Sequence, residues 1–439
     1  MSLASNLDAP SQQRESAAAA YAGWRASTIV LLLFIVVATL SAIRKDVTFG
    51  FDEVAHVSYV AHLQSTHEIW PAFAEMRMLD ASTFRFTDVP NYLDHPSVYY
   101  WLLARIGPGL EGHPEAVLFY RLVNVALVAV GLAAWMAIGI VLRMPPLKLY
   151  AYVLPLACIP VLVPLAGAVN NDNAAFAGAG IAALGALQLV IAGSSPAWLM
   201  ATLIGVIIAS WAKFTALLLT GGLVGGVLLW LLWRGRLPSR WIGPIAMAAL
   251  LASTPYIVFC AQYGSPTPRT PGQLEMITST ALASGWIDAP RLSPLSFAVN
   301  FLSEIVTDWM PSQKPRDALN YMALAIPLTA ALAALAGLVL AVRRIAWAKA
   351  QPLDIIVAAG CAAFAATFAI HGIFAYRLHI EFGWLTSAYP RYYLPLLAII
   401  PLANLVLLDA VTAPKARTLL LVFLIAGPII FRVAGSPFG

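Results

Sequence analysis

The stretch that decides the fold is "WRASTIVLLLFIVVATLSAI", residues 24–43, a run of twenty residues in which Arg25 alone is charged. About twenty apolar residues in a helix cross the hydrocarbon core of a bilayer, and the run is longer than a signal-peptide core. The whole chain has this character: 60% of its 439 residues are hydrophobic, 11% are charged, and the mean hydropathy is +0.79. Soluble domains carry about a quarter charged residues. The sequence therefore predicts an all-α, polytopic membrane protein.

Outward from this helix, the twenty-residue criterion predicts about eleven transmembrane helices. They lie near residues 24–43, 117–142, 148–168, 174–193, 197–213, 215–233, 241–261, 321–342, 353–373, 391–409 and 416–434. Residues 1–23 are polar and small, which predicts a disordered cytoplasmic tail before a single membrane domain, 24–439. Segments 44–116 and 262–320 contain no span and are predicted to be outer loops. In the first, "SVYYWLLARIG" (97–107) is too short to cross and predicts an interfacial helix.

The basic residues predict the orientation of these helices. Short loops at one end of the bundle hold most of them, namely Arg143, Lys148, Arg234, Arg236, Arg240, Arg343, Arg344, Lys349, Lys415 and Arg417. The positive-inside bias makes that end cytoplasmic, together with the N-terminus. The net charge of +5 is thus a feature of topology and predicts no nucleic-acid partner. We expect a multi-pass protein of the cytoplasmic (inner) membrane whose polar site faces the periplasm or the exterior.

The segment "GFDEVAHVSYV", residues 50–60, places Asp52, Glu53 and His56 just after the first helix. Charge at a membrane edge is costly, so such groups are usually functional. In a helix, Asp52 and His56 would share a face, while Glu53 would point about 100° away. One alternative is that Asp52 is a helix N-cap, and another is a metal site. We favour a general base with supporting partners.

Further polar residues fall at the same predicted outer ends of helices. Each has a structural alternative: turn and cap roles for the acids, and an interfacial position for the basic and aromatic groups. These candidates for substrate binding are Asp94, His95 and Tyr99 in "LDHPSVYY", Asp172 in "VNNDNA", Lys213 in "WAKFT", and Arg391 with Tyr392 in "YPRYYLP". Several basic residues that converge with acids favour recognition of a phosphate, for which Arg105 and Arg121 are further candidates.

Neither a nucleotide site nor a thiol site is indicated. The glycine-rich segment "GGLVGG", residues 221–226, lies inside an apolar span and predicts close helix packing rather than a phosphate-binding loop. Cys158, Cys260 and Cys361 lie in or beside apolar runs without paired spacing, which favours simple packing. The sequence thus predicts no cofactor; a divalent metal is possible but not favoured.

The order of these motifs resembles the GT-C superfamily of membrane glycosyltransferases. The nearest branch holds the protein O-mannosyltransferases and the aminoarabinose transferases of lipid A. "FDEVAHVSYV" is similar to the family's Asp-Glu opening, and "LDHPSVYYWLLA" to its His-Pro-Pro-Leu-Tyr-Tyr segment, with Ser97 in place of the second proline. "YRLVNVAL", "SWAKFTALLL" and "YPRYYLPLLA" resemble its Arg-led second helix, its Lys-Tyr/Phe-Thr segment and its C-terminal Arg-Tyr-x-x-Pro helix.

The resemblance implies a sugar donor linked to polyprenyl phosphate and an inverting transfer in which Asp52 is the base. Glu53 and His56 would orient Asp52 or the acceptor, which would be a hydroxyl of a glycan, lipid or protein. Membrane lipids are the other expected partners. A proton-coupled transporter of lipids or sugar-lipids is the alternative, but it predicts internal repeats and polar residues at mid-membrane. A non-catalytic receptor or scaffold is a third hypothesis.

Overall fold

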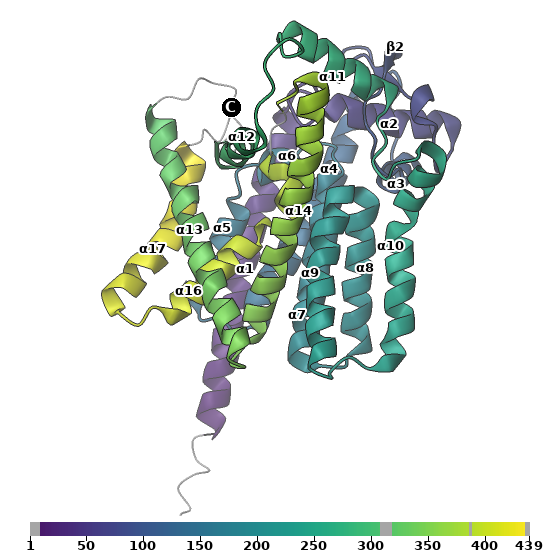
Figure 1. Cartoon of the computed structure of the whole chain (residues 1–439). Helices are drawn as coiled ribbons and strands as arrows, with labels where there is room; N and C mark the ends of the chain where they lie inside the picture. The colour runs from purple at the N-terminus through teal and green to yellow at the C-terminus, as the bar shows by residue number, and fades with distance from the viewer. Residues whose placement is uncertain (1–8, 308–317, 386–388, 435–439) are drawn as a thin grey trace, which may run out of the picture.

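The computed structural model describes residues 9–307, 318–385 and 389–434, and it is mainly helical (Figure 1). Eight helices are long and apolar enough to cross a membrane, or nine if one bent pair counts as a span, within those residues. The all-α, polytopic class is confirmed, with one small exception. Strands β1 (Arg77–Leu79) and β2 (Phe86–Pro90) form an antiparallel hairpin that pairs Leu79 with Phe86.

The elements divide into a bundle and a cap, which Figure 1 shows above the bundle. The cap consists of α2 (Glu53–Thr66), the β-hairpin, α3 (Val98–Ile106) and α11 (Pro271–Ala283), joined by 3-10 turns at Phe73–Glu75 and Pro114–Ala116. The bundle consists of α1 (Ala9–Arg44), α4 (Val117–Val141), α5 (Pro146–Ala157), α6 (Leu162–Ala166), α7 (Asp172–Ala192), α8 (Pro196–Ala212), α9 (Phe214–Trp233), α10 (Ile242–Tyr263), α12 (Pro294–Thr307), α13 (Ala318–Ala346), α14 (Pro352–Phe382), α15 (Leu394–Leu397), α16 (Ile399–Ala410) and α17 (Pro414–Ala434). Two more 3-10 turns, Ser239–Trp241 and Pro390–Tyr393, begin α10 and α15.

The count of eleven spans is not confirmed, because three predicted spans are broken or short. Residues 148–168 form α5 and α6, since Pro160 between them has no N–H to donate and disfavours a helical residue before it. Residues 391–409 form a pair of helices bent by 51° near Ala398. There Pro401 offers no N–H to the carbonyl of Leu397. Residues 197–213 form a 17-residue helix that ends at Ala212.

The predicted tail also differs from the structure. Helix α1 begins at Ala9, so residues 9–23 are helical rather than disordered, and residues 1–8 lie outside the described part. The run "ESAAAAYAGW" explains this, because alanine is the strongest helix former. The second predicted outer loop, 262–320, contains α11, α12 and the first residues of α13, while residues 308–317 within it are not described.

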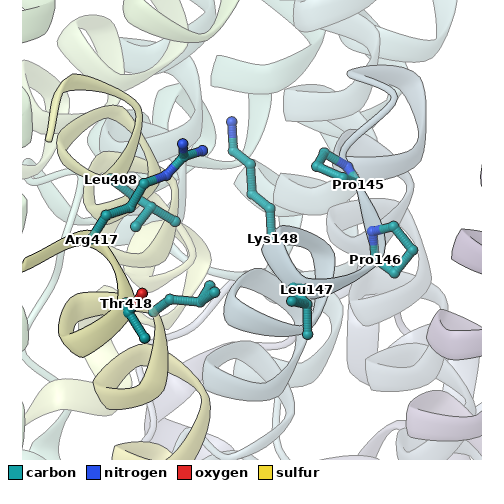
Figure 2. A pocket seen from close by; sticks show the side chains of 8 residues that line it. Pro145, Pro146, Leu147, Lys148, Leu408, Arg417 and Thr418 are labelled. Carbon is teal, nitrogen blue, oxygen red and sulfur yellow. The ribbon is translucent and has the colours of Figure 1, made fainter. Parts of the chain in front are cut away.

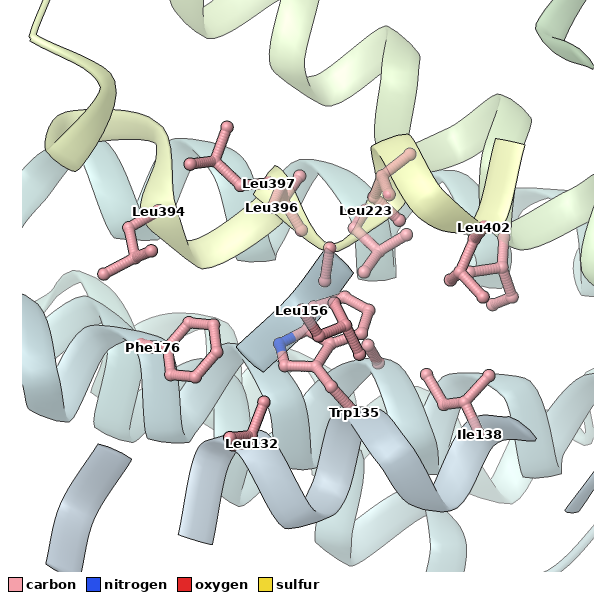
Figure 3. Close-up of a cluster of buried hydrophobic side chains, with 14 of the residues drawn as sticks. Leu132, Trp135, Ile138, Leu156, Phe176, Leu223, Leu394, Leu396, Leu397 and Leu402 are labelled. Atoms are coloured by element: carbon pink, nitrogen blue, oxygen red, sulfur yellow. The ribbon is translucent and has the colours of Figure 1, made fainter. Parts of the chain in front are cut away.

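The core lies where α4, α5, α7 and the bent pair α15–α16 meet. Figure 3 shows Trp135 of α4 among leucines of these elements, with Phe176 of α7 close by. Helix α7 is the most enclosed of the candidate spans. Glycines allow this: a Cβ on Gly178 would lie 2.5 Å from the backbone nitrogen of Ala209 in α8. The predicted packing role of "GGLVGG" also holds, since a Cβ on Gly222 would lie 2.8 Å from Cβ of Ala363 in α14.

The contact between α7 and α8 gives a first prediction. Replacement of Gly178 by Ala forces the two backbones apart, and we expect it to lower the unfolding temperature, because overpacking costs about 1–3 kcal/mol. Gly225→Ala is the matched control, since nothing lies within 4 Å of a Cβ built there. Thermal unfolding of both variants in detergent checks this, and equal unfolding temperatures would contradict the close approach.

Candidate active site

The turn before α2 aims Asp52 away from its own helix. Gly50, Phe51 and Asp52 have φ angles of 73°, 61° and 56°, three successive residues in the left-handed region. Non-glycine residues adopt this region at a cost, so the surroundings must hold them there. Asp52 occupies the N-cap position of α2 but makes no capping hydrogen bond. Its carboxylate is therefore free to face other helices.

The carboxylate of Asp52 binds Arg391, which lies 339 positions later in the chain. Nη2 of Arg391 donates to Oδ2 of Asp52 at 2.7 Å, and the hydroxyl of Tyr92 donates to Oδ1 at 3.2 Å. Burial pushes the pKa of Asp52 up, but Arg391 and Tyr92 outweigh it and leave the pKa below its ordinary value. The side chain of Asp52 still keeps 39% exposure. It is thus an ionised carboxylate that a solute can reach.

Glu53, one residue later, is fully buried and bound on both oxygens. Arg121 of α4 donates Nε to Oε1 at 2.8 Å and Nη2 to Oε2 at 2.9 Å. The backbone N–H of Val169 donates to Oε1, and Nζ of Lys45 lies 3.2 Å from Oε2. The remaining guanidinium nitrogen of Arg121, Nη1, donates to the carbonyls of Ala42, near the end of α1, and Lys45, just after it. Glu53 thus ties together four segments: the end of α1, the start of α2, α4 and the segment before α7.

His56 is also buried, with a partner on each ring nitrogen. The side-chain amide of Asn170 donates to Nε2 at 2.9 Å, so Nδ1 carries the proton and donates to the hydroxyl of Tyr100 at 2.8 Å. This tautomer follows from Oδ1 of Asn170, which accepts from the N–H of Asp172. Burial, with Arg391 nearby, holds the pKa of His56 well below its ordinary value. His56 is a neutral, oriented ring.

His95, in the loop before α3, stacks on this ring, and Asp94 lies beside His95. The rings of His56 and His95 stack with centroids 6.0 Å apart, and Nδ1 of His95 is 3.4 Å from Oδ1 of Asp94. Burial raises the pKa of Asp94 to about 6, and it lowers the pKa of His95. Their side chains are 21% and 20% exposed. Near neutral pH, Asp94 can therefore exchange a proton with a bound solute.

Lys213 supplies a second cation on the same side. It is the single extended residue between α8 and α9, with φ −161° and ψ 143°. Its Nζ binds Oδ1 of Asp172 at 2.8 Å and lies 4.4 Å from the centroid of the Tyr392 ring. Arg391 lies 5.3 Å from the same ring. Two cation–carboxylate pairs thus flank one aromatic ring, and phosphate oxygens can bind to such a pair of cations.

Most residues that the sequence predicted therefore meet in one network, although helices distant in sequence carry them. Tyr99 lies beneath the network, where its hydroxyl donates to Asn124 at 2.7 Å. Arg121 is bound to Glu53. Arg105 lies outside the network, where it contacts the ring of Trp101 and donates to the carbonyl of His67.

Sequence reasoning missed Tyr92 and Asn170. Asn170 belongs to the quoted "VNNDNA" segment, where turn propensity hid its contact with His56, whereas nothing in the sequence marked Tyr92. Among the described residues, no group of three or more His, Cys, Asp or Glu side chains is placed to hold a metal ion.

The chain is similar to two solved structures of ArnT from Cupriavidus metallidurans. The one bound to undecaprenyl phosphate is 14% identical with a TM-score of 0.47, and the apo state is 15% identical with a TM-score of 0.45. Each match covers 91% of this chain and 62% of that chain, so this chain spans about three fifths of the ArnT length. No family model and no curated protein matches the chain.

The buried ion pair gives a second prediction. Arg121→Met removes the guanidinium that binds both oxygens of the buried Glu53 and leaves Lys45 as its remaining cation. Loss of one partner of a buried pair costs about 3–5 kcal/mol. We expect a large fall in the unfolding temperature. Arg85→Met is the control, because Arg85 is exposed. An Arg121→Met protein as stable as the control would show that the pair does not hold these segments.

Proposed function

We propose that this protein is a GT-C-type glycosyltransferase that moves a sugar from a polyprenyl-phosphate donor to a hydroxyl acceptor on the outer face of the cytoplasmic membrane. The observation that carries the proposal is the ion pair between Asp52 and Arg391, in a partly exposed network at helix ends. One member of this pair suits the proton of an acceptor, and the other suits the phosphate of a donor.

The donor phosphate binds to Arg391 and Lys213. The donor is a phosphodiester with one negative charge, and its leaving group is a phosphate monoester that gains charge as the C1–O bond breaks. Fixed cations aimed at this charge stabilise the transition state more than the ground state. Tyr392 lies against both cations and keeps them near each other without neutralising either.

The exchange of partners at Arg391 activates the base. When phosphate oxygens take the guanidinium, Asp52 loses the partner that lowers its pKa. Its carboxylate then accepts the proton of the acceptor hydroxyl while the acceptor oxygen bonds to C1 of the sugar. The C1–O bond to phosphate breaks with its electron pair on the polyprenyl phosphate. A single displacement of this kind inverts the configuration at C1.

The neighbouring residues position the reacting groups. Glu53 holds the start of α2 in place through Arg121. His56 is neutral and fixed by two hydrogen bonds, so it orients the site rather than transferring a proton. Asp94 and His95 are placed to bind hydroxyl groups of the sugar or the acceptor. No step requires a cofactor in this scheme.

Transfer from a synthetic polyprenyl-phosphate sugar by the purified protein tests the base. We expect Asp52→Asn to lower turnover by about 10²–10⁴-fold, the usual contribution of a general base. Asp46→Asn is the matched control, because Asp46 lies six residues earlier, is exposed and bonds to Thr48. Full turnover by Asp52→Asn would overturn the assignment. Gradient-dependent uptake of the sugar lipid into vesicles without transfer would favour the transporter instead.

The exchange of partners predicts a pH signature. The acid limb of kcat/KM reports the free enzyme, in which Arg391 lowers the pKa of Asp52, whereas the limb of kcat reports the donor complex. We therefore expect the acid limb of the pH profile of kcat to lie at higher pH than the acid limb of the profile of kcat/KM. Arg391→Gln removes the pairing in the free enzyme and should bring the two limbs together. Arg269→Gln, which breaks an exposed pair with Glu381 outside the site, should leave them apart. Coincident limbs in the wild-type enzyme would rule out the exchange.

A further inference from the structure

A second basic site lies at the other end of the bundle. Helix α4 leaves the active site at Arg121 and runs twenty residues to Val141, which is roughly 30 Å at 1.5 Å per residue. Just beyond its end, a cavity of about 470 Å³ opens between the start of α5, the end of α16 and the start of α17 (Figure 2). The proposed reaction uses none of the residues that line it.

Two cations share this cavity. Nζ of Lys148 binds Oδ2 of Asp409 at 2.6 Å. Arg417 is exposed, and no ion pair or side-chain hydrogen bond joins it to any residue in the described part of the chain. Figure 2 shows the guanidinium of Arg417 and the ammonium of Lys148 extending into the same space. Lys148 is paired with Asp409 whereas Arg417 has no anionic partner among the described residues, so the cavity carries a net positive charge that one anion would neutralise.

The rest of the lining is apolar. Leu147, Leu408 and Leu421 contribute to the walls, and the hydroxyl of Thr418 lies beside them. Leu147 is 61% exposed, and α17 continues from the cavity with the exposed side chains of Leu419 and Val422. A free inorganic anion gains no binding free energy from contact with such apolar walls. An anion attached to hydrocarbon chains is stabilised both by the two cations and by the apolar walls.

We propose that this cavity binds the headgroup of an anionic phospholipid from the leaflet opposite the active site. The phosphodiester oxygens lie between Arg417 and Lys148, Thr418 donates a hydrogen bond to them, and the acyl chains run along α17. The positive-inside orientation places this end of the bundle in the cytoplasmic leaflet, where anionic lipids and basic pockets between helices meet. The site is separate from the proposed transfer reaction and does not depend on it.

Native mass spectrometry of the full-length protein in neutral detergent tests the proposal, with phosphatidylglycerol and phosphatidylcholine of the same chain length as probes. We expect the wild-type protein to retain phosphatidylglycerol at least tenfold better than phosphatidylcholine. Arg417→Gln should remove this preference, and Arg417→Lys should keep part of it. Arg240→Gln is the matched control, because Arg240 is also exposed at a helix end but lies outside the cavity, and it should keep the full preference.

One further variant and one competition experiment distinguish a lipid site from a site for free phosphate. Leu147→Glu adds a carboxylate at the wall without altering either cation, and it should also remove the preference, so the proposal stays testable if Arg417→Gln fails to fold. Inorganic phosphate at millimolar concentration should not displace the lipid. Displacement by phosphate, equal retention of both lipids, or an unchanged preference in Arg417→Gln or Leu147→Glu would each overturn the proposal.

Discussion

The buried ion pair between Glu53 and Arg121 is the interaction on which the rest of the structure depends. It joins the end of α1, the start of α2, the start of α4 and the segment before α7, and both oxygens of Glu53 are taken up. Charges out of water are tolerable here because both oxygens of Glu53 and the three guanidinium nitrogens of Arg121 are hydrogen-bonded. The pair anchors Glu53, the first residue of α2, directly after the left-handed turn at Asp52.

Asp52 then faces helices that come from the far end of the chain. Arg391, which binds Asp52, and Lys213, which binds Asp172, both lie against the ring of Tyr392. In this arrangement the resting protein holds the proposed base, Asp52, with Arg391, the same group that is proposed to bind a donor phosphate. The proposed chemistry thus begins with an exchange of anions at Arg391, and no large rearrangement of helices is required for it.

The features that could be predicted from the sequence are those that depend on residues close together in the chain. Hydropathy and charge bias are local, so the sequence indicated the membrane class and placed Asp52, Lys213 and Arg391 on the same side. The breaks at Pro160 and Pro401 were visible in the sequence, but a count based on length alone overlooked them, and three predicted spans were not confirmed as single long helices. The partners of Glu53 were hidden, because Arg121 is 68 positions away. Nor did the sequence show that Asp52 would not cap its helix, since that depends on the backbone angles of the preceding turn.

A structure of the protein with a synthetic polyprenyl phosphate bound is the most direct test of the central claim. The account predicts phosphate oxygens within hydrogen-bonding distance of Arg391 and Lys213, with the carboxylate of Asp52 separated from Arg391 and the pair of Glu53 with Arg121 unchanged. A phosphate bound elsewhere, with the contact between Asp52 and Arg391 still at its resting distance of 2.7 Å, would contradict it.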